Sequence, residues 1–455
     1  MTTQPSPNVV VIYADDLGWG DLGCFGADDF CTPALDALAA NGIRLPEWYS
    51  NSPVCSPSRA SLLTGRYPAR AGVEAILGGT RHTAGLPPQP TLATALRERG
   101  YATGIFGKWH LGADPAFGPL HYGFDTHFGF RAGCVDYYSH IYYWGEHNPI
   151  HDLWADEDEV WLNGEYLTTA IAERASAYIE ANAERPFFCY IPFNAPHYPM
   201  HAPEEYVRQF EHLPKDRRIM AAMVKAMDDG VALVMSTLER LGLRDNTIVF
   251  MSSDNGPSIE ERNWLNGEEV SYTGGSAGGL RGHKGSLFEG GIRVPGIISW
   301  PAGLPAGVEL ASPGLMMDLL PTVLEAVDGR PVEDDSIDGR SLLETMRQAA
   351  NDVGATASGL AMKRLRAGER TTCWEYEGQL AARWGRWKLV LDGRETMQAP
   401  VVVLQGLYDL VEDPAESTDI SARHPEVVAT MTAAVQEWTS AAWRSEPPVP
   451  IDHSH

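Results

Sequence analysis

The chain has 455 residues, of which 44% are hydrophobic and 21% are charged, a composition that excludes a disordered or fibrous protein and provides enough chain for a large core. It carries 35 Lys and Arg against 60 Asp and Glu, so the net charge is −25 at pH 7. This acidic balance argues against a nucleic-acid binder, although a local cluster of basic side chains would still attract a small anion into a cleft.

Continuous apolar runs alternate with helical patterns through the first 300 residues. Apolar runs without polar alternation are typical of strands buried on both faces. Such runs occupy residues 9–14, 187–192, 247–252 and 295–300. Helical periodicity is found at residues 33–41, 91–99, 168–182 and 217–241. The alternation predicts an α/β fold with a large, mixed, mainly parallel sheet sandwiched by helices.

The last hundred residues follow a different pattern. Segment 347–369 is rich in Ala, Gly and charge, and is predicted to be a linker with a boundary near residue 355. Short antiparallel strands are predicted at 380–391, 401–404 and 406–410, and a helix at 425–442. We therefore expect one large domain over residues 1–355 and a C-terminal α+β subdomain over 356–455, with a small antiparallel sheet and a terminal helix.

Two acidic pairs directly follow predicted strands. Asp15 and Asp16 come after the run 9–14, and Asp254 and Asn255 come after the run 247–252. Ligands collect at the carboxyl ends of parallel strands, so we expect these side chains to meet at one edge of the sheet. Adjacent carboxylates repel one another unless a cation lies between them, and hard oxygen donors suit Ca²⁺ or Mg²⁺ rather than zinc. Ca²⁺ is favoured because it tolerates irregular geometry; for the first pair alone, a capped turn is the alternative.

Residues 55–65 are predicted to form a short helix, with Pro57 near its start and Gly65 at its end. Cys55 would lie at the helix N-terminus, where backbone N–H groups favour an anion, and Arg59 one turn later on the same side. An unmodified Cys55 is expected to be a thiolate of low pKa there. A small helix with a merely buried cysteine is the alternative reading.

The motif Cys55-x-Pro57-x-Arg59, followed by Thr64-Gly65, resembles the signature of type I sulfatases, in which the cysteine is oxidised to Cα-formylglycine. Further motifs match in the family's order over nearly the whole chain, at residues 14–21, 107–112, 196–197, 253–256, 281–285, 383–389 and 407–410. The resemblance implies an alkaline phosphatase-like fold with residues 1–355 as the catalytic domain. It also implies hydrolysis of aryl or carbohydrate sulfate monoesters to an alcohol and inorganic sulfate.

The resemblance further implies a nucleophile and a metal site. Hydrated formylglycine at position 55 would attack sulfur with one hydroxyl, and the second hydroxyl would allow the aldehyde to re-form and expel sulfate. The family's ligands for one Ca²⁺ match Asp15, Asp16, Cys55, Asp254 and Asn255.

The remaining motif residues match the family's catalytic side chains. Arg59 and Lys108 would orient and stabilise the diol. His110 would take a proton as the aldehyde re-forms. His197 and Lys284 would bind sulfate and protonate the departing oxygen. Taken singly, each of these residues could equally belong to a turn or a solvated loop. The catalytic roles are assigned only because the motifs occur together in the order found in the family.

The segment 134–154 is dense in Tyr, His and Trp, and its stretch 136–140 is similar to the arylsulfatase A/B branch. Aromatic rings with polar tips suit the wall of a pocket for an aryl or sugar leaving group. The side chains predicted to line that pocket are Ser139, His140, Tyr143 and His147. A packed surface loop or a subunit contact is the alternative.

Two other functions fit the same motifs. One is a formylglycine-dependent phosphonate or phosphate ester hydrolase of the same superfamily, and the other is a binding protein in which Cys55 stays a thiol. A two-zinc phosphatase is disfavoured because its second ligand set is not found. The expected partners are a small sulfate ester and a formylglycine-generating enzyme, without nucleic acid or membrane.

The N-terminus carries no positively charged leader, because the first basic residue is Arg44, and no apolar run is long enough to span a bilayer. The six cysteines are then expected to be reduced thiols in a cytoplasmic protein. A leader removed by processing would instead make it periplasmic or secreted. A homo-oligomer is possible only in the general sense that dimers are common among soluble proteins.

Overall fold

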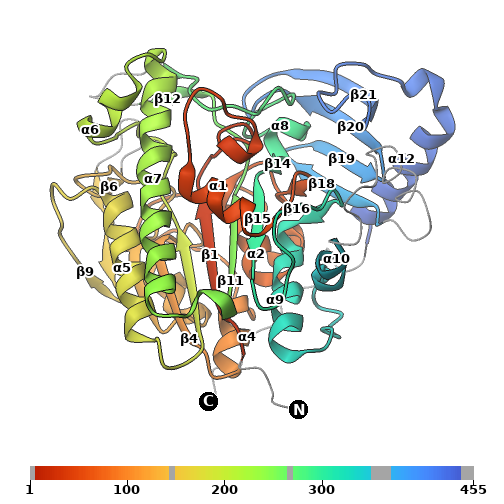
Figure 1. The fold of residues 1–455 in the computed structure, drawn as a ribbon. Coiled ribbons are helices and arrows are strands. Elements are labelled where there is room, and N and C mark those ends of the chain that lie inside the picture. The colour runs from red at the N-terminus through yellow and green to blue at the C-terminus, as the bar shows by residue number, and fades with distance from the viewer. Residues whose placement is uncertain (1–5, 143–148, 264–269, 350–369, 442–455) are drawn as a thin grey trace.

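A computed structural model describes residues 6–142, 149–263, 270–349 and 370–441, and a ten-stranded sheet forms its centre (Figure 1). In spatial order its strands are β16 (Val308–Glu309), β2 (Ile43–Arg44), β15 (Gly296–Ser299), β11 (Thr247–Ser253), β1 (Asn8–Ala14), β10 (Phe187–Pro192), β4 (Ala102–Lys108), β5 (Thr126–Phe130), β8 (Trp154–Ala155) and β9 (Asp158–Glu159). The strands from β11 to β5 are mutually parallel, and antiparallel neighbours flank them on both sides. The prediction of a mixed, mainly parallel sheet is therefore confirmed.

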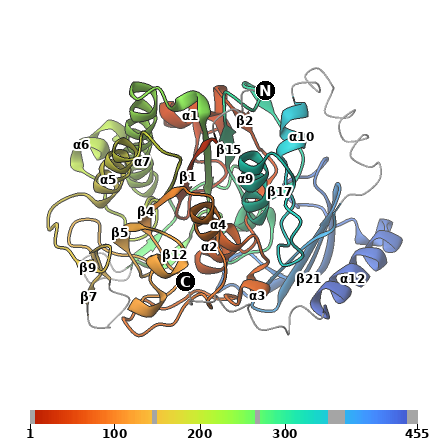
Figure 2. The ribbon, with the colours of Figure 1, turned by 90° about the horizontal axis from the view of Figure 1, so that it is seen from below.

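Helices cover both faces of this sheet (Figure 2). On one face lie α1 (Pro33–Ala40), α5 (Leu167–Ala181) and α7 (Lys215–Arg240). On the other lie α2 (Cys55–Thr64), α4 (Leu92–Glu98) and α9 (Leu319–Asp328). Shorter helices are α3 (Pro68–Ala71), α6 (Glu204–Val207), α8 (Glu289–Ile292) and α10 (Leu343–Gln348). The four helices predicted from periodicity agree with α1, α4, α5 and α7 to within two residues at each end.

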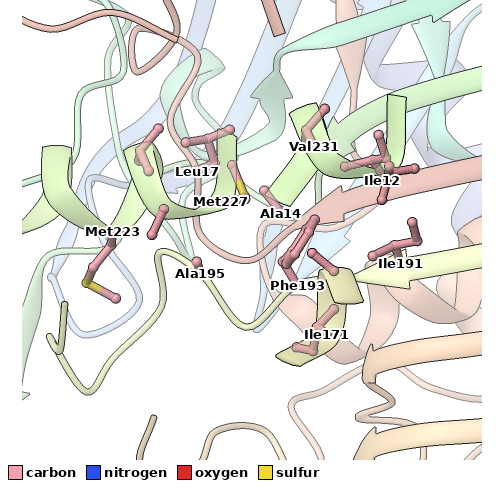
Figure 3. Close-up of a cluster of buried hydrophobic side chains, with 14 of the residues drawn as sticks. Ile12, Ala14, Leu17, Ile171, Ile191, Phe193, Ala195, Met223, Met227 and Val231 are labelled. Atoms are coloured by element: carbon pink, nitrogen blue, oxygen red, sulfur yellow. The ribbon is translucent and has the colours of Figure 1, made fainter. Parts of the chain in front are cut away.

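The core follows from the alternation of side chains along the buried strands. In β1, Val10 and Ile12 face α5 and α7, whereas Val9 and Val11 face α2, α4 and α9. Figure 3 shows Ile12 packed among side chains of α5 and α7. Each fully buried aliphatic side chain contributes about 1.5–3 kcal/mol. Because helices cover both faces, the strands need apolar residues at every position, which explains the continuous apolar runs.

A separate four-stranded antiparallel sheet lies beside the main body, with α12 (Pro425–Thr439) packed against it (Figure 1). Its strands are β18 (Thr372–Tyr376), β19 (Gln379–Trp384), β20 (Trp387–Arg394) and β21 (Val401–Asp409). The two predicted strands 401–404 and 406–410 are one strand, because Gly406 continues the register opposite Val390. Strand β18 was not predicted. The proposed boundary at residue 355 lies outside the described residues.

Short strand groups complete the fold. They are β14 (Arg293–Val294) with β3 (Trp48–Tyr49) and β17 (Gly314–Leu315), β6 (Ile141–Tyr142) with β7 (Ile150–His151), and β12 (Glu260–Asn263) with β13 (Val270–Tyr272). Within the described ranges, every helix is too short or too polar to cross a lipid bilayer.

A buried charge network joins the small sheet to the main body. Lys388 of β20 donates from Nζ to Glu289 Oε1 of α8 at 2.9 Å and lies 3.1 Å from Glu416 Oε1. All three side chains are fully buried. Tyr49 of β3 donates to the other oxygen of Glu289 at 2.6 Å. Removing one member of a buried ion group leaves an uncompensated charge, so the network holds α8 against β20 in a fixed position.

Buried His127 in β5 should make stability depend on pH. Burial lowers its pKa from 6.5 to about 3. Between these values the unfolded chain binds a proton and the folded chain does not, so stability falls as the pH drops through this window. At pH 5 the loss from this residue is roughly 2 kcal/mol relative to pH 7.5.

We expect His127→Gln to remove that contribution. The wild type should lose roughly 2 kcal/mol more than the variant on going from pH 7.5 to pH 5, measured by urea unfolding at both values. Parallel pH profiles for the two proteins would show that the imidazole is not held neutral by burial.

Candidate active site

The carboxyl edge of the parallel strands gathers polar side chains from several distant segments. The strand ends supply Asp15 and Asp16 after β1, Lys108 as the last residue of β4, His197 after β10, and Asp254 and Asn255 after β11. Cys55 and Arg59 come from α2, and Lys284 from the loop before α8. Lys108 therefore belongs to the strand itself rather than to a solvated loop.

Helix α2 delivers Cys55 into the middle of this cluster. Cys55 is its first residue and is 1% exposed, and no side chain caps the helix N-terminus. All ten residues of α2 are buried although half of them are polar. Two of their hydroxyls bind backbone groups: Ser58 Oγ donates to Val54 O at 2.9 Å, and Ser56 Oγ accepts from the Leu77 N–H at 3.1 Å. The uncapped N–H groups at this end favour an anion beside Cys55.

Three buried carboxylates in the cluster each have a cation of their own. The pairs are Lys108 Nζ with Asp15 Oδ2 at 2.7 Å, Arg59 Nη2 with Asp254 Oδ2 at 2.6 Å, and Lys284 Nζ with Asp16 Oδ2 at 2.8 Å. All six side chains are at most 6% exposed. Each cation offsets part of the cost of burying its carboxyl, but burial still raises the pKa of Asp15 to about 8 although Lys108 opposes the shift.

The cations also decide how these carboxyls titrate. Burial alone would raise the pKa of Asp254, but Arg59 and Lys108 outweigh it and hold the pKa below its usual range. Lys284 and His197 lower the pKa of Asp16 against burial in the same way. Asp16 and Asp254 are therefore carboxylates at neutral pH, the form that binds a cation.

Donor atoms converge tightly at this edge. Asp15, Asp16, Cys55 and His197 each offer one ligand atom, and these atoms all lie within 4.8 Å of one another. Asn255 lies beside them and donates from Nδ2 to Asp16 Oδ1 at 2.7 Å. Its Oδ1 is buried and has no hydrogen-bond partner among the described residues. A buried amide oxygen without a partner costs about 1–3 kcal/mol, which a bound cation would offset.

Two buried histidines present unprotonated nitrogens. His197 Nδ1 donates to Tyr198 O at 2.7 Å, so its Nε2 accepts from Lys284 Nζ at 3.2 Å. Burial and then Lys284 lower the pKa of His197 to about 3. His110 Nε2 donates to Leu77 O at 3.0 Å, and its buried Nδ1 has no partner in the described part of the chain. Burial holds the pKa of His110 well below its usual value, so Nδ1 is a free base at neutral pH.

The thiol of Cys55 does not behave as its position at a helix N-terminus suggests. Burial raises its pKa, although Lys108 and Lys284 oppose the shift. The expectation of a low-pKa thiolate was wrong, because desolvation of the anion outweighs the helix dipole and the nearby cations. As an unmodified thiol, Cys55 is therefore a poor nucleophile at neutral pH.

Comparisons with known proteins agree with this arrangement. The family model described as Sulfatase matches residues 7–329. The chain belongs to the sulfatase family. It is 36% identical over 375 residues to N-acetylgalactosamine-6-sulfatase of Rattus norvegicus, covering 76% of this chain and 66% of that protein. It is 32% identical over 414 residues to steryl-sulfatase of the same species, covering 74% and 70%.

Solved structures extend the likeness to the C-terminal sheet. The crystal structure of Ps i-CgsB in complex with k-i-k-neocarrahexaose has a TM-score of 0.81 and 29% sequence identity, and covers 99% of this chain and 95% of its own. The alkaline phosphatase-like architecture of the sulfatases is therefore shared over nearly the whole chain.

The small C-terminal sheet holds the loop that carries Lys284. This role of the sheet was not predicted from the sequence. Gln379 of β19 donates from Nε2 to Gly285 O at 2.8 Å and accepts from the Arg394 N–H at 3.1 Å. The Lys284 N–H donates to Pro257 O at 2.9 Å. The loop that carries Lys284 is thus clamped between the main body and the C-terminal sheet. No sequence signal marks Gln379, because its partner lies 94 residues away.

Aromatic residues next to the motifs were also missed. The Arg59 guanidinium lies 5.3 Å from the ring centre of Tyr13, which precedes the first acidic pair. Tyr137 donates to the backbone oxygens of Asn194 and His197, at 2.8 Å each, and so fixes the loop after β10. Both tyrosines are fully buried and contact residues of this cluster or the loop that carries them.

The predicted pocket residues do not join this cluster as a group. Ser139 is half-buried, and its N–H donates to Asp136 Oδ1 at 2.7 Å. His140 is fully buried, and its Nε2 lies 3.2 Å from Glu165 O. Tyr143 and His147 lie outside the described residues. The turn at 136–140 is organised by Asp136, whose carboxylate also contacts His201 Nδ1 at 3.2 Å.

The Arg59–Asp254 pair should be essential for stability. We expect Arg59→Met to destabilise the fold by about 3–5 kcal/mol, because Asp254 is left buried without its cation. Adding Asp254→Asn in the same chain should recover part of the loss. Urea unfolding of the single variants, the double variant and the wild type gives the coupling energy.

A matched control is the exposed pair Arg208–Glu204, where both side chains are more than half exposed. Arg208→Met should change stability by less than about 1 kcal/mol. Equal losses at the two pairs would contradict the assignment of the Arg59–Asp254 pair as a structural necessity.

Proposed function

We propose that the chain hydrolyses sulfate monoesters, carbohydrate sulfates foremost, through a formylglycine at position 55 and one Ca²⁺. The proposal rests on the side chains that surround Cys55. A non-nucleophilic thiol at an uncapped helix N-terminus is enclosed by three cations and by a converging set of oxygen donors. Such a centre is built to hold an anion over a residue that must first be modified to react.

The names of the relatives support a carbohydrate substrate. One family member matched by the chain acts on N-acetylgalactosamine-6-sulfate, another on steryl sulfate, and Ps i-CgsB binds a neocarrahexaose. These esters share the sulfate group and differ in the alcohol. The cluster around Cys55 concerns only the sulfate, so the choice of alcohol lies in residues farther out.

The donor set fits Ca²⁺. Carboxylates of Asp15, Asp16 and Asp254 and the unpartnered Oδ1 of Asn255 are hard oxygens at one sheet edge. The family uses this metal, and the residues that would hold it here are these four together with residue 55. Bound there, Ca²⁺ would neutralise a sulfate oxygen and lower the pKa of the attacking hydroxyl.

Formylglycine would replace an inert thiol by a reactive group. Once hydrated, residue 55 would supply one hydroxyl to attack sulfur and a second hydroxyl whose deprotonation releases inorganic sulfate. Arg59 and Lys108 lie beside position 55 and stabilise the developing oxyanion. The formylglycine-generating enzyme is then the partner required for maturation.

The two histidines and Lys284 divide the proton transfers. His110 Nδ1 is the free base that takes the proton from the second hydroxyl. Lys284, in contact with His197 Nε2, carries the proton that the departing alcohol oxygen needs. Because His197 is neutral, its Nε2 accepts a hydrogen bond from the charged Lys284 and so holds that lysine in place for the transfer.

Peptide mass spectrometry across Cys55 tests the nucleophile. On protein produced with a formylglycine-generating enzyme, we expect the mass change of a thiol replaced by an aldehyde or its hydrate. That preparation should hydrolyse 4-nitrophenyl sulfate, and Cys55→Ala should lose at least a thousand-fold in kcat because it lacks the attacking group.

The same preparations separate the competing functions. A large preference for 4-nitrophenyl phenylphosphonate over the sulfate would assign the chain to phosphonate hydrolysis. Fully modified protein that binds sulfate esters without turnover would indicate a binding protein. A peptide in which Cys55 remains entirely unmodified would refute the assignment of formylglycine as the nucleophile.

Calcium should stabilise the fold through Asn255. We expect the unfolding free energy to rise by about 2.7 kcal/mol when Ca²⁺ is present at a hundred times its Kd, and a chelator to reverse the gain. Asn255→Leu removes the unpartnered oxygen and should abolish most of this increment. The control Asn182→Leu, at the far end of α5, should leave it intact, and an equal increment in both variants would place the ion elsewhere.

A further inference from the structure

Trp161 is exposed in an unusual way. It leaves 61% of its surface in solvent, although most large aromatic side chains of this protein are buried. Its ring stacks on His151 with the ring centres 3.6 Å apart and the planes within 8°. His151 therefore covers one face of the indole, and the opposite face accounts for the exposure. A single exposed tryptophan needs no explanation, but an indole with one face stacked on a histidine and the other face open to solvent does.

The register of the sheet places Trp161 at the same edge as Cys55. Strand β8 runs antiparallel to β5, and β9 returns antiparallel to β8, so β9 points toward the carboxyl edge. The pairing continues past β9, because the Val160 N–H donates to Leu153 O at 2.9 Å. Trp161 follows directly. Strand β9 lies three positions from β4, which ends at Lys108, or roughly 14 Å at the spacing of neighbouring strands.

The stacked pair is held rigidly. His151 Nδ1 lies 2.9 Å from Glu159 Oε1, and Arg81 donates to the same oxygen at 2.6 Å. Arg81 also donates to His151 O at 3.1 Å. The imidazole under Trp161 is thus held by Glu159, and Arg81 holds both Glu159 and the backbone of His151. A ligand that stacks on the indole therefore binds to a surface whose supporting side chain is already ordered.

A short segment links this pair to the centre. The Leu77 N–H donates to Ser56 Oγ next to Cys55, and Leu77 O accepts from His110. Four residues later, Arg81 binds Glu159 and His151. An extended chain of that length would span at most roughly 13 Å, so Arg81 lies within that distance of Leu77. The spacing across the strands then separates the indole from the cluster around Cys55 by more than the width of one sugar ring.

We propose that Trp161 is a stacking platform for a sugar ring of an oligosaccharide whose sulfated unit lies at Cys55. This rests on the proposed sulfatase function and narrows its substrate to an extended glycan. The apolar C–H face of a pyranose complements the open indole face.

Binding measurements test the platform apart from turnover. In a Cys55→Ala background, calorimetry compares k-i-k-neocarrahexaose with a chondroitin-6-sulfate hexasaccharide and with the disaccharide of each series. We expect one hexasaccharide to bind at least ten-fold more tightly than its disaccharide. Trp161→Ala should erase that gain, and Trp161→Phe should keep most of it. Trp384→Ala, an exposed tryptophan on the small sheet, should leave the gain unchanged.

The outcomes separate the two proposals. Turnover of 4-nitrophenyl sulfate without any gain from chain length, or a gain that survives Trp161→Ala, overturns the platform and leaves the sulfatase function standing. Absence of sulfate ester turnover with a gain that depends on Trp161 overturns the hydrolytic function and leaves the platform. Absence of hexasaccharide binding in both series overturns the platform.

Discussion

The candidate active centre depends on placing three neighbouring carboxyl groups in the interior. Asp16 and Asp254 are charged at neutral pH, whereas burial raises the pKa of Asp15 to about 8. Their mutual repulsion and their desolvation both favour protonation, and only a cation in direct contact with each one offsets these effects. Lys108, Arg59 and Lys284 provide these contacts, and each comes from a different element. The convergence of strand β4, helix α2 and the loop before α8 on one sheet edge is therefore an electrostatic requirement as much as a packing one.

This constraint explains two features that burial alone does not. Half of the residues of helix α2 are polar, yet the helix lies fully inside the protein, because Arg59 binds Asp254 and the hydroxyls of Ser56 and Ser58 bind backbone groups. The C-terminal sheet, in turn, is needed at the centre although it contributes no residue to the converging donors. It holds the backbone next to Lys284 through Gln379, and it anchors α8 through the buried network of Lys388.

Sequence reasoning was strongest where a local pattern encodes the geometry. The acidic pairs could be placed because they follow buried strands, and Cys55 and Arg59 because four residues make one helical turn. Lys108, His197 and Lys284 carry no such local pattern, and only resemblance to a family singled them out. The contact of Gln379 with Gly285 joins segments that are 94 residues apart, so no periodicity reveals it. The state of the Cys55 thiol was misjudged because desolvation depends on burial, which the linear motif does not show.

The position of Lys284 in the chain has a consequence for synthesis. Asp15, Cys55, Arg59 and Lys108 are all present once the first 108 residues have been made, whereas Asp16 must wait for a cation 268 residues later. The loop that carries that cation is in turn secured by β19, which is translated almost a hundred residues after it. A growing chain thus makes Cys55 and Lys108 well before Asp254 and Lys284, and strand β10, which lies between β1 and β4, also comes later in the chain. A product that ends before Asp254 would leave Arg59 without its carboxylate, so the cluster around Cys55 can form only late in synthesis.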